Sequence, residues 1–166
     1  MKKAARTDLR PMREKSLELL EGVDAGEPPY DSYLVRTVHA LRKKPIGEFT
    51  TEDLRITIGQ GIGLAYLLPL ALERLEIEPL ATGHFYCGDL LTNVIRAELE
   101  WGGSREVGDR LQVVIERALE QLTRVKPTDW AGGEVPDLGM PDETDRATLE
   151  PQLHTALEVI RSRAGR

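Results

Sequence analysis

The chain has a single cysteine and no long apolar run. Because Cys87 has no partner within the 166 residues, no internal disulfide can form, which fits a reducing compartment. The densest apolar stretch, residues 62–75, is shorter than the roughly 20 residues of a membrane span and contains Glu73 and Arg74. The basic N-terminus is not followed by an apolar segment, so no secretion signal is expected. We therefore expect a soluble, cytoplasmic protein that does not enter a membrane.

Positive charge is scarce outside the first fifteen residues. The chain has 22 Lys and Arg against 28 Asp and Glu, a net charge of −6. Residues 1–15 hold six bases and two acids, a net charge of +4, so the other 151 residues carry −10. Such an acidic body disfavours binding to nucleic acid, which depends on phosphate neutralisation, and favours basic protein partners. The alternative is that the charge serves only to keep the protein soluble.

The apolar residues follow helical periods, and no segment has the pattern of a strand. The clearest helix start is Thr50, whose side chain can accept a hydrogen bond from the first turn while Asp53 reaches back, as in a capping box. Residues 64–75 are apolar almost all round a helix, which predicts a central buried helix with a kink or restart at Pro69. Further helices are predicted over residues 13–21, 31–42, 89–101, 104–125 and 148–161. The fold class is therefore all-α, a compact bundle of about six or seven helices.

Two segments lie outside this helical pattern. Residues 1–12 are expected to form a flexible basic N-terminus, ahead of a single helical domain over residues 13–166. Residues 127–147 hold three prolines, three glycines and six acids against one base, which predicts a long acidic loop. Thr148 is expected to cap the last helix and to place Pro151 in its first turn, where a missing NH is tolerated.

Three groups of residues could carry chemistry, but each has a simpler structural interpretation. The IGQGIG motif at residues 58–63 has no preceding strand and no following lysine, so it indicates a turn between helices, not a phosphate-binding loop. His84, Cys87 and Asp89 fall short of the about four ligands of a zinc site; Cys87 is expected to pack in the core and Asp89 to cap a helix. A Cys87 nucleophile would need a nearby histidine, which the sequence does not place. Enzymatic function has little support, and no metal is expected.

Four motifs, in order, resemble the contact-dependent growth inhibition (CDI) immunity proteins of bacteria. They are SYLVRT at 32–37, FTTEDLRITIGQ at 49–60, IGLAYLLPLAL at 62–72 and GDLL at 88–91. The resemblance covers somewhat more than a third of the chain. It implies a small cytoplasmic protein that binds and neutralises the toxic C-terminal domain of a large secreted exoprotein, without catalysis and without a cofactor.

The acidic body agrees with this implied role. Many toxins of such systems are nucleases with basic substrate-binding surfaces, which an acidic protein can cover by charge complementarity. Trp130 could serve as an aromatic anchor, although packing back onto the core is the simpler interpretation. The candidate toxin-binding residues are Asp31, Glu48, Glu52, Asp53, Asp89, Trp130, Glu134 and Asp137. The alternatives are a helical regulatory or scaffold protein with another intracellular partner, and a small enzyme using Cys87; the toxin's identity and the oligomeric state do not follow from the sequence.

Overall fold

The computed structural model describes residues 10–29, 31–102, 104–124 and 141–164. Over these ranges the regular structure is helical, and the only strand-like pairing is an isolated bridge between Ser16 and Pro45. The predicted all-α fold is confirmed. The elements are η1 (Arg10–Met12), α1 (Leu17–Glu21), α2 (Tyr33–Lys43), η2 (Ile46–Glu48), α3 (Thr51–Gly59), α4 (Leu64–Ile77), α5 (Asp89–Trp101), α6 (Arg105–Thr123) and α7 (Glu143–Ala164).

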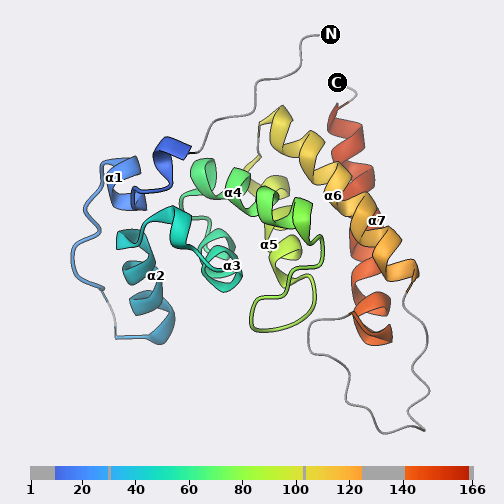
Figure 1. Ribbon diagram of the computed structural model, residues 1–166, viewed down its shortest axis with the longest axis horizontal. Coiled ribbons are helices and arrows are strands. Elements are labelled where there is room, and N and C mark those ends of the chain that lie inside the picture. Colours follow the sequence, from blue (N-terminus) through green and yellow to red (C-terminus); the bar gives the residue numbers. More distant parts are fainter. Residues whose placement is uncertain (1–9, 30, 103, 125–140, 165–166) are drawn as a thin grey trace, which may run out of the picture.

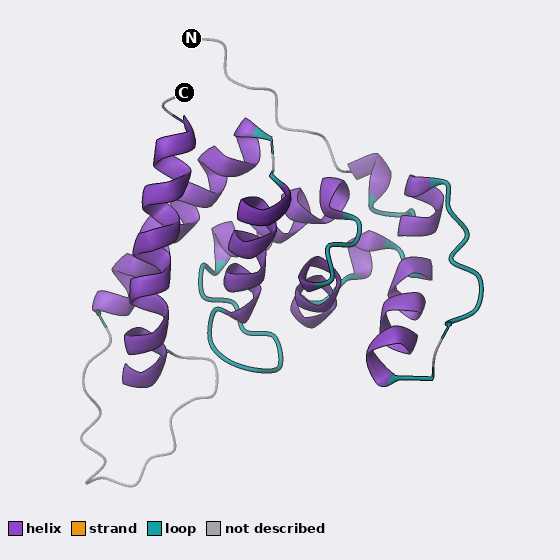
Figure 2. Ribbon diagram, turned by 180° about the vertical axis from the view of Figure 1, so that it is seen from behind, coloured by secondary structure: helices purple, strands orange, loops and turns teal. Residues whose placement is uncertain are grey.

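The helices form three groups side by side. Helices α1 and α2 lie at one side, α3, α4 and α5 form the centre, and α6 and α7 run antiparallel at the other side (Figures 1 and 2). Helix α3 packs on α5, and α6 packs on both α4 and α7, so one apolar core runs through the molecule. Its fully or almost fully buried residues include Leu17, Leu72, Leu90, Ile115 and Leu153. Across the described part of the chain, no helix is both long enough and apolar enough to span a membrane.

The predicted capping box at the start of α3 is confirmed. Thr50 Oγ1 accepts a hydrogen bond from the Asp53 NH at 3.1 Å, and Asp53 Oδ2 accepts one from the Thr50 NH at 2.9 Å. The turn into α4 is also as predicted, and Gly63 adopts a left-handed φ of 63° there. Helix α4 continues through Pro69 without a restart. Because the residue four positions back, Ala65, is exposed, water can satisfy the carbonyl that Pro69 leaves without a donor.

The first helix is shorter than predicted. We expected it to begin at Arg13, but α1 begins at Leu17, after Ser16, whose side chain accepts from the Leu19 NH. The backbone before Ser16 is used elsewhere: the carbonyls of residues 13 and 15 accept hydrogen bonds from the NH groups of residues 47 and 46. Residues 10–12, expected to be flexible, form η1, and residues 1–9 lie outside the described part.

The last helix begins earlier than predicted, which corrects the role of Thr148 as its cap. Asp142 Oδ1 accepts from the Asp145 NH at 2.8 Å and Asp145 Oδ2 accepts from the Asp142 NH at 3.2 Å, so these two residues cap each other's backbone and α7 starts at Glu143. Pro151 consequently lies inside the helix and not in its first turn. It is on the exposed side, where the carbonyl left without a donor can bind water.

Candidate functional site

The connection between α4 and α5 is held by two carboxylates. Asp89 Oδ1 accepts a hydrogen bond from the Gly83 NH at 2.6 Å, and Asp89 Oδ2 accepts one from the Phe85 NH at 3.1 Å. Glu52 Oε2, on α3, accepts one from the His84 NH at 3.0 Å. Three consecutive backbone NH groups are therefore bound by side chains from two helices. This fixes the loop of residues 82–86, called the aromatic loop below, against the body of the protein.

Asp89 has a different structural role from the one predicted. The residue at the N-cap of α5 is Gly88, with a left-handed φ of 79°, and Asp89 is the first residue of the helix. Glycine takes this conformation at little steric cost, which lets the chain turn sharply into α5 and directs the Asp89 carboxylate back to the loop. The Asp89 side chain is only 1% exposed. Asp89 was predicted to contact the toxin, but its side chain lies beneath the surface.

Arg55 balances these two carboxylates. Its Nε and Nη2 donate to the two oxygens of Glu52 at 2.6 and 2.7 Å, and its Nε lies 3.7 Å from Asp89 Oδ2. The hydrogen bonds from Arg55 hold the pKa of Glu52 below its ordinary value although burial opposes this. The guanidinium also stacks 4.4 Å from the centre of the Phe85 ring. We call Glu52, Arg55 and Asp89 the ionic cluster.

Gly83 is required where the loop crosses the ionic cluster. A Cβ atom at this position would lie 2.6 Å from Glu52 Oε2 and 2.8 Å from Asp89 Oδ2. Both carboxylates are held by several hydrogen bonds, so neither can move away easily. The close approach of the backbone to the cluster therefore depends on the absence of a side chain at Gly83.

Acid should weaken the ionic cluster through Glu52. Because its pKa in the folded protein is lowered from 4.5, the ionised form contributes stability above that value, and this contribution is lost as the pH falls through the folded pKa. We expect the free energy of unfolding of the wild type to fall more steeply below about pH 4.5 than that of Glu52→Gln. Urea denaturation of both proteins between pH 7 and pH 3 measures this, and parallel curves would contradict it.

The ionic cluster borders a groove on the surface. A hollow of about 590 Å³ is lined by residues 47–52, Arg74 and residues 82–84. A second hollow of about 430 Å³ shares Gly47, Phe49 and Arg74 with it and continues along α4 to residues 77 and 78. We call the two together the acidic groove, because Glu48, Glu52, Glu73 and Glu78 line it against the bases Arg13 and Arg74.

The acidic groove also has an exposed apolar side chain at one end. The side chain of Ile77 is 84% exposed there, at the last residue of α4. Arg74 lies between the two hollows and donates to Thr51 Oγ1 at 3.3 Å and to the Phe49 carbonyl at 3.4 Å, so much of its hydrogen-bonding capacity is directed at the protein. Glu48 and Glu78 are exposed. The groove thus combines acidic side chains with an exposed aliphatic one.

Apart from the buried Asp89, the predicted toxin contacts fall in three places. Glu48 and Glu52 line the acidic groove. Asp53 lies next to it and pairs with Lys44 at 2.8 Å; burial raises its pKa, but Lys44 and the Thr50 NH more than compensate, so the pKa is lowered. Asp31 precedes α2 and pairs with Arg36 at 2.5 Å. The other predicted contacts, Trp130, Glu134 and Asp137, lie outside the described residues.

Sequence reasoning missed several residues of the site. Arg55 and Ile77 had no distinguishing signal, because each looks like an ordinary residue of an amphipathic helix. The run of ring-bearing residues at 84–86 is visible in the sequence, and in the structure Phe85 and Tyr86 are exposed. Only the fold shows that this run adjoins Glu48 and Glu52, more than thirty residues earlier in the chain.

Cys87 is placed as a core residue, as predicted. Its Sγ lies 3.5 Å from the Leu80 carbonyl oxygen, and the side chain is buried. Burial raises the pKa of the thiol to about 11, so it stays protonated at neutral pH and is a poor nucleophile. Among the residues that the structure describes, no group of three or more His, Cys, Asp or Glu could hold a metal ion.

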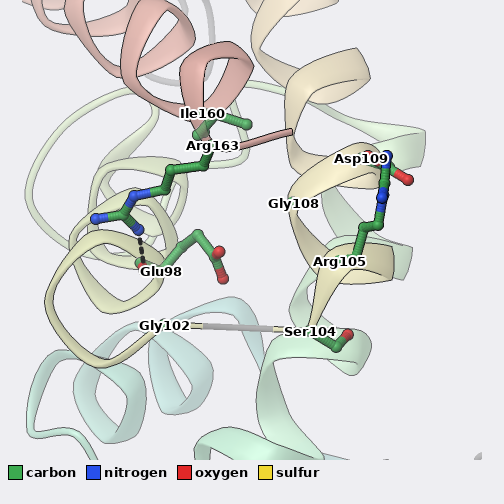
Figure 3. Close-up of a pocket in the computed structure, with 8 residues that line it drawn as sticks. All are labelled: Glu98, Gly102, Ser104, Arg105, Gly108, Asp109, Ile160 and Arg163. Atoms are coloured by element: carbon green, nitrogen blue, oxygen red, sulfur yellow. Dashed lines mark hydrogen bonds between the residues drawn. The ribbon is translucent and has the colours of Figure 1, made fainter. Parts of the chain in front are cut away.

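A further cavity of about 250 Å³ lies where α5, α6 and α7 meet (Figure 3). Arg163 extends from α7 and donates to the carbonyls of Glu98 at 3.3 Å and Leu99 at 3.2 Å, which lie in the last turns of α5. Arg105 and Asp109 face each other on the α6 side (Figure 3). The lining therefore carries both positive and negative side chains, and the hydrogen bonds of Arg163 connect α7 to α5.

The structure is that of a small helical protein with an acidic, partly apolar groove on its surface. The family model of CDI immunity proteins matches residues 19–106, which are 88 of the 166 residues. The chain therefore belongs to the CDI immunity protein family, and the resemblance seen in the sequence is confirmed. The membership supports an immunity function against CDI toxins. Comparisons with curated proteins and with solved structures found no match.

Proposed function

We propose that this protein protects the cell by binding the toxic C-terminal domain of a CDI exoprotein in the cytoplasm and occluding it one to one, without catalysis. The observation that carries the proposal is the family match, whose range of 19–106 contains the whole aromatic loop and nearly all of the acidic groove. Arg13 is the only groove residue named above that precedes the matched range.

The charge of the protein supports a nuclease as the toxin. A nuclease must bind a polyanion, so the surface around its active site is basic. The chain beyond its first fifteen residues carries a net charge of −10, and Glu48 and Glu78 are exposed in the groove. Such complementarity speeds association and disfavours wrong partners. Covering the basic surface also blocks substrate, so binding alone inhibits the toxin.

Calorimetric titration tests this proposal. The titrant is the purified C-terminal domain of the exoprotein encoded beside this gene, at low and at high salt. We expect one-to-one binding that weakens with salt, and loss of the toxin's nuclease activity at equimolar protein. Absence of binding at both salt concentrations contradicts the proposal for this pair, and binding to a toxin without nuclease activity contradicts the proposed toxin class.

A matched pair of charge reversals locates the contact. Glu48→Lys places a positive charge in the acidic groove, and Glu158→Lys makes the same change at an exposed position on α7. We expect Glu48→Lys to lower the association rate at least about tenfold at low salt, and Glu158→Lys to have a much smaller effect. Equal effects would show that only the overall charge matters and not the groove.

A further inference from the structure

The aromatic loop presents three ring-bearing side chains to solvent on a fixed backbone. His84 is 74% exposed, Phe85 72% and Tyr86 43%. Exposure of an apolar ring to water is unfavourable, so burying it on binding stabilises the complex, and the net gain is largest when the backbone that carries it is already ordered. Here the NH groups of residues 83–85 are all bound by the ionic cluster. The loop therefore has the character of a preformed contact element.

Phe85 has the most defined position of the three rings. Arg55 stacks on one side of it at 4.4 Å and is itself held by both oxygens of Glu52. The ring is thereby supported from beneath, while most of its surface remains open to solvent. Its backbone NH is fixed by Asp89, which is buried. Both ends of the side chain are thus placed by the ionic cluster.

We propose that Phe85 is the principal anchor for the toxin and that Arg55 is a positioning residue that holds it in place. This inference rests on the proposed function. The matching surface on the toxin is a recess formed by the aliphatic parts of lysine and arginine side chains, whose charged ends reach the acidic groove. Gly83 and His84, which directly precede Phe85, line that groove, so we expect one basic surface to contact both the ring and the groove.

The exposed apolar side chains on or near α1 and α2 lack this setting. Leu19, Val23, Tyr33 and Leu34 are exposed on or near α1 and α2, but none of them lines the acidic groove. Near Val23, Glu18 and Asp24 do accept from the consecutive NH groups of residues 25 and 26, but these carboxylates belong to the same stretch of chain and do not line the groove. Tyr33 is 72% exposed, the same fraction as Phe85, and it is also aromatic. It therefore provides a matched control for the loss of an exposed ring.

The test compares Phe85→Ala with Tyr33→Ala in binding to the same purified toxin domain. We expect Phe85→Ala to weaken binding by about 30-fold or more, mainly through faster dissociation, and Tyr33→Ala to remain within about threefold of the wild type. Both variants should keep the wild-type midpoint of urea denaturation within experimental scatter, because both rings are exposed. Phe85→Ala binding within about threefold of the wild type would overturn the inference while leaving the proposed function intact; no binding by the wild type itself contradicts both.

Arg55→Lys tests the positioning role, since it keeps the charge but loses the paired hydrogen bonds and the planar stack. Native-state hydrogen exchange should become at least about tenfold faster at the amides of residues 83–85, and toxin binding should weaken as the loop loses its fixed conformation. Amides in α6 serve as the internal reference. Unchanged exchange at the loop amides would overturn the positioning role of Arg55.

Discussion

Replacing Gly63 by alanine is expected to lower the free energy of unfolding by about 2–5 kcal/mol. Gly63 has a left-handed φ of 63°, a conformation that costs an alanine roughly 1–2 kcal/mol. In addition, the new Cβ would lie 2.6 and 2.9 Å from the two methyl carbons of Leu17. Leu17 is fully buried, so it cannot move aside without disturbing the packing of α1, which adds a further cost of about 1–3 kcal/mol.

Gly22→Ala is the matched control for this prediction. Gly22 has nearly the same φ, 67°, but a Cβ there would meet no other heavy atom within 4 Å. Its replacement therefore isolates the backbone cost, about 1–2 kcal/mol. Urea denaturation of the two variants and the wild type gives both values. Equal losses for Gly22→Ala and Gly63→Ala would show that Leu17 adapts freely and that the contact with α1 is not restrictive.

The sequence predicted best what neighbouring residues decide. The capping box of Thr50 and Asp53 spans four residues, and the start of α6 after Ser104 is confirmed by a hydrogen bond from the Val107 NH to the Ser104 side chain. The apolar spacing that predicted α6 gives its buried face in the structure. Such patterns specify helices without reference to the rest of the fold, so the all-α class followed from them.

The wrong helix boundaries have particular causes. The backbone before α1 is held by hydrogen bonds to residues 46 and 47, some thirty residues away, which no local pattern reveals, although Ser16 is a local capping signal for the helix itself. The start of α7 did have a local signal, because Asp142 and Asp145 have capping-box spacing, but the surrounding acids, glycines and prolines favoured a loop. At α5, Asp89 was expected to be the N-cap, but Gly88, in a left-handed conformation, occupies that position.

The site could be predicted only in part, because it is assembled from separate elements. Charge alone selected Glu48 and Glu52, and both do line the groove. Their grouping with Ile77 and the aromatic loop depends on how α3, α4 and α5 pack, and the sequence contains no local record of that packing. Asp89 looked like its neighbouring acids in the sequence, yet its role is to organise the loop from beneath the surface.

Replacing Arg55 by methionine is expected to lower the free energy of unfolding by about 3–5 kcal/mol. Methionine preserves much of the length and apolar volume of the side chain but removes the cation between Glu52 and Asp89. The side chains of these two acids are 14% and 1% exposed, so their charges would remain largely desolvated and repel each other. Urea denaturation at pH 7 measures the loss.

Two further variants separate the ionic cluster from ion pairing in general. Arg36→Met breaks a surface pair with Asp31, both well exposed, and should cost no more than about 1 kcal/mol. In the Arg55→Met background, adding Glu52→Gln and Asp89→Asn removes the unbalanced charges and leaves one accepting oxygen on each side chain, although one of the two loop NH groups that Asp89 binds loses its acceptor. This triple variant should recover part of the stability, because the main penalty in Arg55→Met is uncompensated charge. If it recovers none, the loss in Arg55→Met does not come from uncompensated charge, which would contradict this account of the ionic cluster.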